Sequence, residues 1–336
     1  MSAPDAMRAV EIGLELPHDS PALVVSAAGR VALESRPVPR PGAGQLLVQT
    51  EYSGVSVGTE MWAATGRVEW TPMPFVPGYQ AVGRVVALGD ESPEVGLTVG
   101  DLVACFAMGA HQRYVVASTS LTHRIEFNER LPTAALFVQP AVGANALNMA
   151  DVQAGDSVMV IGQGLIGQTT AQVARLRGAY VVGTEVSPER IEFSRAHCVD
   201  RVIDTSTALA SEQVAEQFPD GVDVVIESTG VTPVDDAMRC VRRGGTVVFE
   251  GYYPDGVTFD FAIPHEKEVK AVFPSFIGGR NCREGILRLL TNGVLDLHPL
   301  ISHLVCWRDA ADIYNQLFTS ERNRFNGVIF DWRGSQ

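Results

Sequence analysis

Lysine, paired cysteines and long hydrophobic runs are all scarce in this chain of 336 residues. Lysine occurs only at positions 267 and 270, and acidic side chains outnumber basic ones by 39 to 26, which gives a net charge of −13. This excess of negative charge argues against the basic face that nucleic acids and anionic membranes require. The five cysteines form no CxxC pair, so the sequence predicts neither a disulfide framework nor a zinc ribbon.

Targeting segments are also missing from the sequence. No run approaches the ~18 apolar residues of a membrane span. The first residues, MSAPDAMRAVEIG, lack the basic start and the apolar core of a signal peptide. We therefore expect a cytoplasmic protein with no membrane and no nucleic acid among its partners.

The first 120 residues or so have the pattern of β-strands. Short apolar runs at 22–26, 46–52, 81–88 and 114–117 are separated by glycine, proline and acidic turns. This spacing predicts a small barrel of antiparallel strands. Residues 132–150 then predict one long apolar helix with proline near its start.

Strands and helices alternate in the second part of the chain. Apolar runs, each expected to be a strand, lie at 157–161, 180–184, 201–203, 222–226, 246–250 and 269–273. Nearly continuous apolar strands are typical of a parallel sheet covered on both faces, and six of them fit a doubly wound sheet. One helix is expected to have Thr232 as its cap and to end at Gly244 and Gly245. The strand-like end, GVIFDW, is expected to return to the first domain.

The stretch SVMVIGQGLIGQTTAQVARLRGAYVVGTE, residues 157–185, contains a glycine pattern between a strand and a helix. Gly162 permits a tight turn, Gly164 lets the backbone approach a pyrophosphate, and Gly167 lets helix and strand pack closely. The N-terminus of the helix, with Leu165 and Ile166, offers free N–H groups to phosphates. This order of parts predicts a dinucleotide site.

Glu185 ends the next strand and is expected to accept hydrogen bonds from the adenosine ribose. A 2′-phosphate would face this carboxylate, so the sequence favours NAD over NADP. Arg190 argues against this preference for NAD, because its side chain could turn toward a 2′-phosphate. The alternatives are a glycine turn that binds nothing in a flavodoxin-like sheet, and a site for flavin or S-adenosylmethionine.

Further cofactor contacts are expected where the fourth and fifth strands of this sheet end, because strand carboxyl ends line the cofactor crevice. The expected residues are Ser228, Thr229, Gly230, Gly251 and Tyr252.

Several motifs together resemble the medium-chain dehydrogenase/reductase superfamily. They are YSGVSVGTE, VPGYQAVGRVVALG, VGDLV, the glycine pattern, VDVVIESTG and RRGGTVVFEGYY. The resemblance implies an α/β fold with a GroES-like β-barrel catalytic domain and a six-stranded Rossmann domain. It places the catalytic domain at 1–140, the NAD(P)-binding domain at 141–274 and a return to the catalytic domain at 275–336. It also implies a homodimer joined through the edges of the Rossmann sheets.

The sequence departs from the zinc alcohol dehydrogenases at each ligand position. Where that group has a cysteine, Ser56 and Val57 stand, and its Gly-His-Glu is replaced by Gly78, Tyr79 and Gln80. The third ligand is expected near Gln139, and amides and hydroxyls are not the ligands of catalytic zinc. We therefore predict no metal. The segments GTE and PGYQAVG resemble those of a zinc-independent subgroup that includes bacteriochlorophyllide 3-hydroxyethyl dehydrogenase-type proteins.

Catalysis without zinc needs a hydrogen-bond donor for the substrate oxygen. Tyr79 replaces the zinc-binding histidine and is the first candidate, although it could merely fill the vacated space. Ser56 and Thr59 are candidates for hydrogen bonds to substrate or cofactor, or for turn capping. Glu60 is expected to be a structural or relay carboxylate, and His111 a structural histidine.

The sequence thus predicts an NAD-dependent, zinc-independent oxidoreductase. Its expected reaction interconverts a secondary alcohol and a ketone of a small molecule, in secondary metabolism. The alternatives are an NAD(P)H-dependent C=C reductase acting on enones or quinones, and a dinucleotide-binding protein without turnover.

Overall fold

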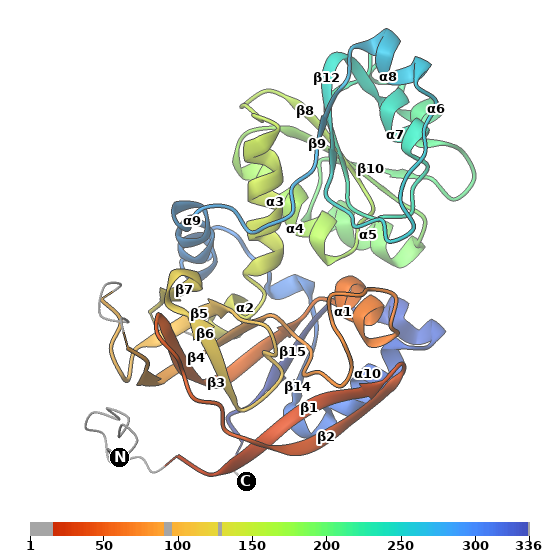
Figure 1. Ribbon diagram of the computed structural model, residues 1–336. Coiled ribbons are helices and arrows are strands. Elements are labelled where there is room, and N and C mark those ends of the chain that lie inside the picture. The colour runs from red at the N-terminus through yellow and green to blue at the C-terminus, as the bar shows by residue number, and fades with distance from the viewer. Residues whose placement is uncertain (1–15, 91–95, 127–129, 335–336) are drawn as a thin grey trace. The chain divides into compact units, whose positions relative to one another are not determined.

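The computed structural model describes residues 16–90, 96–126 and 130–334, and the chain divides into two compact units (Figure 1). The first unit consists of Met1–Phe137 and Leu287–Gln336, and the second of Val138–Ile286. Each unit has its own sheet and its own buried core.

The first unit is built around a seven-stranded sheet. Its strand order is β14-β15-β3-β4-β5-β7, and β6 pairs with β3 off this path. These strands are β3 (Gln45–Val55), β4 (Gln80–Leu88), β5 (Leu102–Phe106), β6 (Tyr114–Ser118), β7 (Thr122–Arg124), β14 (Ile301–Cys306) and β15 (Gly327–Asp331). Only the pair β14–β15 is parallel among the described strands of this sheet. Because β15 pairs with β3, strands from both the first and the last part of the chain form this sheet.

The remaining elements of the first unit are a hairpin and several short helices. The hairpin consists of β1 (Asp19–Ala27) and β2 (Arg30–Pro37). Among the described residues, the helices of this unit are α1 (Val57–Ala64), α2 (Leu131–Ala134), α10 (Ala310–Leu317) and four 3₁₀ turns, η2 (Thr119–Leu121), η3 (His298–Leu300), η4 (Trp307–Asp309) and η5 (Ser320–Arg324). A core cluster joins β3, β15 and α10, and it includes Tyr314, Phe330 and Trp332.

The second unit contains a six-stranded, fully parallel sheet of order β10-β9-β8-β11-β12-β13. The strands are β8 (Ser157–Ile161), β9 (Tyr180–Glu185), β10 (Arg201–Asp204), β11 (Val222–Glu227), β12 (Val241–Phe249) and β13 (Lys270–Val272). The order is that of a doubly wound sheet, which confirms the predicted fold class. The direction of winding changes between β8 and β11, and such a point is where ligands bind in these sheets.

Helices flank this sheet in the second unit. In the view of Figure 1, α3 (Val138–Met149) and α4 (Leu165–Leu176) lie to one side of it, and α6 (Ala210–Val214), α7 (Val234–Cys240) and α8 (Ala262–Lys267) to the other. The other helices are α5 (Pro188–His197) and α9 (Arg280–Thr291), which contains the boundary at residue 286. Covered on both faces, the strands bury β-branched residues almost continuously, as the sequence indicated.

The predicted long helix at 132–150 is wrong in one respect, because the structure divides it into α2 and α3. The N–H groups of Ala135, Leu136 and Phe137 bond three residues back, in a tight turn rather than an α-helix. Pro140 explains the break, since it has no N–H with which to reach the carbonyl group of Leu136.

The expected boundaries of the helix after Thr232 are also wrong. Pro233 occupies the N-cap position, and the Thr232 hydroxyl instead lies 2.9 Å from that of Thr229. The helix ends at Cys240, because Val241 is extended and pairs with β11. Gly244 and Gly245 therefore lie within β12.

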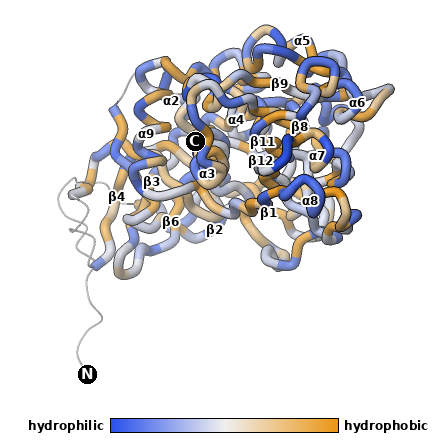
Figure 2. Tube along the Cα trace, turned by 90° about the horizontal axis from the view of Figure 1, so that it is seen from above, coloured by the Kyte–Doolittle hydropathy of each residue, from blue (hydrophilic) through white to orange (hydrophobic). Residues whose placement is uncertain are grey.

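Hydropathy agrees with this arrangement of short helices on two sheets. Figure 2 shows hydrophilic residues interspersed with hydrophobic ones along the helices. Within residues 16–90, 96–126 and 130–334, no helix combines the length and the hydrophobicity that a membrane crossing requires.

Candidate functional site

The glycine-rich turn lies between β8 and α4, at the point where the winding of the sheet reverses. Gly162 has a φ of 86°, which a residue with a side chain rarely adopts. A Cβ atom at Gly167 would overlap the carbonyl oxygen of Gly162, whereas one at Gly164 would meet no atom within 4 Å. Open space at Gly164 beside the first helical turn, Leu165 and Ile166, leaves room for a phosphate at free N–H groups. These residues thus fit a dinucleotide.

Glu185, at the end of β9, is buried and accepts three backbone hydrogen bonds. Its Oε2 atom accepts from the N–H of Gln163 at 3.0 Å, and its Oε1 atom accepts from those of Val186 and Ser187 at 2.7 and 3.1 Å. The Arg190 guanidinium lies 4.0 Å from the same carboxylate. Glu185 therefore holds the glycine-rich turn directly, a role that the sequence did not indicate. A carboxylate offers about four acceptor positions, so one stays available for a ribose hydroxyl.

The loop after β11 makes hydrogen bonds to the glycine-rich turn. The Ser228 hydroxyl donates to the carbonyl groups of Ile161 and Gly162, at 2.8 and 3.1 Å. A Cβ atom at Gly162 would meet the Thr229 side chain, so the two loops touch. Ser228 and Thr229, which are expected to contact the cofactor, thus lie next to the glycine-rich turn.

Glu227 ends β11 as Glu185 ends β9, and sequence reasoning missed it. Its carboxylate accepts from the N–H groups of Thr229 and Gly230 at 2.8 and 3.1 Å, and from the Thr229 hydroxyl. A Cβ atom at Gly251 would overlap Gly230, so the loops after β11 and β12 also pack closely. Glu227 could have been found from the sequence, because it is a carboxylate that directly follows an apolar run predicted to be a buried strand. Tyr252, by contrast, is 54% exposed.

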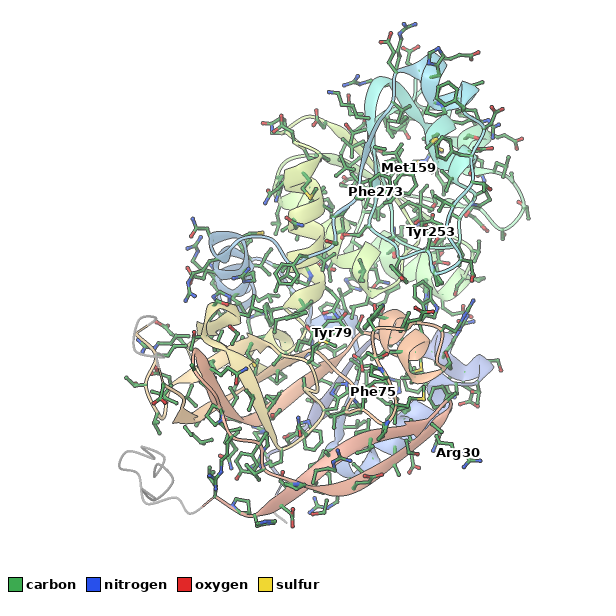
Figure 3. All side chains as sticks on the ribbon, viewed as in Figure 1. Arg30, Phe75, Tyr79, Met159, Tyr253 and Phe273 are labelled. Carbon is green, nitrogen blue, oxygen red and sulfur yellow. The ribbon has the colours of Figure 1, made fainter. Side chains whose placement is uncertain are left out.

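The predicted catalytic residues come together in the first unit, around Tyr79, which Figure 3 labels. The Tyr79 hydroxyl makes side-chain hydrogen bonds with Ser56 and Thr59. Desolvation is the largest influence on this phenol and raises its pKa above the ordinary value, and the nearby charge of Glu60 adds to the rise. Tyr79 therefore stays protonated near neutral pH and can act as a hydrogen-bond donor.

The backbone at Tyr79 is fixed by the segment that follows β5. The N–H of Ala107 donates to the Tyr79 carbonyl group at 2.9 Å, and the His111 N–H donates to that of Pro77 at 3.0 Å. Gly78, with a φ of 84°, leaves space that the His111 ring occupies. The Phe106 ring lies 5.6 Å from that of Tyr79. Position 79 is thus held from both its backbone and its ring.

A buried polar network lies behind these residues. Glu60 accepts from the Ser56 N–H at 2.7 Å, from His111 Nε2 at 3.0 Å and from the Tyr314 hydroxyl. Desolvation, together with the charge of Glu60, raises the pKa of Tyr314 well above its ordinary value. Glu60 thus connects the Ser56 backbone to the core of the unit.

The network continues from His111 to the end of the chain. His111 Nδ1 lies 2.8 Å from Ser53 Oγ, which accepts from the Trp332 indole N–H at 2.8 Å. His111, for which a structural role is expected, is fully buried. Tyr314 and Trp332 were missed by sequence reasoning, because nothing near them in the sequence pointed to Glu60 or Ser53.

Zinc does not fit the side chains at these positions. Ser56 and Tyr79 present hydroxyl groups, and Gln139 is an amide, whereas catalytic zinc takes three ligands from cysteine, histidine and carboxylate side chains. In the described part of the chain, no three His, Cys, Asp or Glu residues gather so that they could hold a metal ion.

Two family models match the chain. One, described as an alcohol dehydrogenase GroES-like domain, matches residues 42–126, and the other, described as a zinc-binding dehydrogenase, matches residues 166–292. Among curated relatives, L-galactonate-5-dehydrogenase of Escherichia coli (strain K12) is 26% identical over 340 residues, which cover 91% of this chain and 98% of the relative.

Solved structures share the fold. A structure described as a zinc-binding dehydrogenase from Sinorhizobium meliloti 1021, solved with bound NADP, has a TM-score of 0.83 at 23% identity and covers 94% of this chain and 99% of its own. An alcohol dehydrogenase from Escherichia coli CFT073, complexed with NADH, has a TM-score of 0.83 at 18% identity, with 94% and 100% covered.

The curated relatives include dehydrogenases and reductases of alcohols and polyols, which supports an oxidoreductase. Together, the family models and the relatives indicate that this chain belongs to the medium-chain dehydrogenase/reductase superfamily.

Proposed function

We propose that this chain is a zinc-independent, NAD(H)-dependent oxidoreductase that interconverts a secondary alcohol and a ketone. The observation that carries the proposal is the open glycine-rich turn at the reversal point of the sheet, with a buried carboxylate at the end of the neighbouring strand. Similar folds have been solved with NADP and with NADH, which supports a nicotinamide dinucleotide.

The preference for NAD over NADP rests on Glu185. A 2′-phosphate beside this carboxylate would repel it, and the only nearby positive charge, among the contacts the structure gives to Glu185, is Arg190. The three backbone donors that hold Glu185 also prevent it from turning away. The carboxylate is therefore a fixed part of the proposed ribose site.

The chemistry divides between the cofactor and the first unit. When bound, the nicotinamide supplies or accepts the hydride. The Tyr79 phenol donates a hydrogen bond to the substrate oxygen, where negative charge develops. The hydroxyl groups of Ser56 and Thr59 fix the position of the phenol. Glu60 holds the loop that carries Ser56 and does not itself contact the reacting atoms.

The function is tested by assaying purified protein with NADH and NADPH against matched panels of ketones and enones. Reduction of ketones with NADH supports the proposal. Turnover of enones alone, with either cofactor, would instead favour the C=C reductase. Cofactor binding without turnover of any compound would favour a non-catalytic dinucleotide-binding protein.

Zinc independence gives a separate prediction. Ketone reduction should be unchanged after dialysis against a strong chelator, and elemental analysis should find far less than one zinc per chain, because the side chains at the site do not suit the metal. Stoichiometric zinc whose removal abolishes the activity would contradict this part of the proposal.

Substitution of Glu185 tests the cofactor preference. In Glu185→Ala, NAD binding should weaken about tenfold or more, because a hydrogen bond to a charged group is lost. The ratio of NADP to NAD affinity should rise, because the charge that repels a 2′-phosphate is removed. Titration of both cofactors by nucleotide fluorescence or calorimetry measures both effects.

Glu192→Ala is the matched control for Glu185→Ala. Glu192 lies on α5, in the same unit, and its side chain is 73% exposed. This variant should keep the wild-type preference. An unchanged ratio in Glu185→Ala would contradict the assignment of Glu185.

The setting of the reaction is also part of the proposal. We propose a small-molecule substrate in secondary metabolism, a cytoplasmic location and the zinc-independent subgroup named above. The proposed homodimer forms through the sheet edge at β13. This strand pairs only with β12 among the described strands, and Phe273 beside it is 64% exposed.

A further inference from the structure

Glu250 is a carboxyl group that no step above uses. It directly follows β12, and its N–H, like that of Gly251, donates to the carbonyl oxygen of Glu227. One carboxyl oxygen, Oε1, lies 2.9 Å from the Thr170 hydroxyl on α4. The other, Oε2, is buried and has no hydrogen-bond partner. An ionised carboxyl with an unpaired oxygen in such a place is costly.

Among the described residues, the influences on the Glu250 carboxyl are burial, a hydroxyl group and a second carboxylate, and none of them is a cation. Desolvation raises the pKa of Glu250 to about 8, the hydrogen bond of Thr170 opposes the rise, and Glu227 adds to it. Tyr253 lies against Glu227 and stays neutral, because burial raises its pKa. Helix α3, which packs on α4 at Thr170, has no titratable side chain, and Arg175 of α4 is paired with Asp200. Glu250 is therefore protonated near neutral pH.

The position of Glu250 associates it with the nicotinamide half of a dinucleotide. In a doubly wound sheet the two halves of the cofactor lie on the two sides of the reversal point. Glu185 ends β9 on the adenosine side, so the loops after β11 and β12 belong to the other half. These loops are in contact with the glycine-rich turn, through Gly162 and Thr229, and with each other, through Gly230 and Gly251.

We propose that the protonation state of the Glu250 carboxyl depends on the charge of the nicotinamide ring. The carboxyl loses its proton to solvent when NAD⁺ binds and keeps its proton when NADH binds. The inference rests on the proposed use of NAD(H). The oxidised ring is a cation and the reduced ring is neutral. A cation bound at the loops after β11 and β12 would stabilise the ionised carboxyl, whereas a neutral ring would add only desolvation.

This proposal determines how the affinity for each dinucleotide should change with pH. Since the free protein holds the proton up to about pH 8 and the NAD⁺ complex does not, NAD⁺ affinity should rise with pH below about 8 and level off above it. The rise is about tenfold for each unit by which the bound cation lowers the pKa. NADH affinity should not rise over the same range.

The test is calorimetric titration of NAD⁺ and NADH between about pH 6 and 9, in buffers of different ionisation enthalpy. The wild-type protein should release up to about one proton per NAD⁺ bound and none per NADH. Glu250→Gln keeps the shape of the side chain and its contact with Thr170, and it should abolish both the release and the pH dependence. Glu216→Gln, which removes an exposed carboxyl of the same unit, should behave as wild type.

A second variant keeps the test informative if Glu250→Gln fails to fold. In Thr170→Val the hydrogen bond that lowers the pKa is lost, so the pH at which NAD⁺ affinity levels off should move upward. Proton release unchanged in Glu250→Gln, or equal release with NAD⁺ and NADH, would overturn the inference and leave the proposed function standing. Failure of the wild-type protein to bind either dinucleotide would overturn both.

Discussion

Replacement of Tyr79 by phenylalanine should slow ketone reduction by about 10²-fold or more, the loss typical of removing a positioned acid or donor. The reason is local: the phenol remains protonated, and Ser56 and Thr59 hold it by hydrogen bonds. Phenylalanine fills the same space and removes only the donor. The loss should therefore appear in kcat, and the affinity for NADH should be unchanged.

Tyr52→Phe is the matched control for Tyr79→Phe. Tyr52 is a buried tyrosine of β3 in the same unit, and its ring lies under the Arg333 guanidinium, at 4.5 Å. The control should retain its activity. With deuterated NADH, the Tyr79→Phe enzyme should show a kinetic isotope effect at least as large as that of the wild type, because the chemical step limits its rate. A rate near that of the wild type would show that Tyr79 only fills space.

The second unit could be predicted from the sequence because its signals are local. Each buried strand of a parallel sheet is an unbroken apolar run, and β8, β9 and β11 begin and end within a residue or two of the predicted runs. Each glycine of the pattern is required for a physical reason. In the structure, Gly162 has a positive φ, and Gly167 lies too close to the Gly162 carbonyl group for a side chain. The helix boundaries that were predicted wrongly depend on single residues, such as Pro140, whose missing N–H explains the break between α2 and α3.

The network behind Tyr79 could not be predicted, because it depends on contacts between distant parts of the chain. Glu60 meets Tyr314, 254 positions away, and Ser53 meets Trp332, 279 positions away. These contacts exist only because β15 pairs with β3 and α10 packs beneath them. A sequence shows that such residues are candidates for burial, but it does not show which polar atoms face each other.

The stability of the first unit should depend strongly on Glu60. In Glu60→Ala, the Ser56 N–H, His111 Nε2 and the Tyr314 hydroxyl lose their shared acceptor in a buried site. Removing one partner of a buried charged network costs about 3–5 kcal/mol, so the free energy of unfolding should fall by that amount. All four tryptophans lie in this unit, so their fluorescence during urea unfolding reports on it.

Two further variants distinguish the network from a general effect of lost charge. Tyr314→Phe removes one donor and leaves Glu60 its other two partners, so it should cost about 1–3 kcal/mol. Glu34→Ala removes a half-exposed carboxylate of β2, in the same unit, whose ion pair with Arg36 spans 3.5 Å. Such surface pairs contribute at most about 1 kcal/mol. A loss in Glu60→Ala no larger than that in Glu34→Ala would mean that the network does not stabilise the loop that carries Ser56, and the positioning of Tyr79 would then need another explanation.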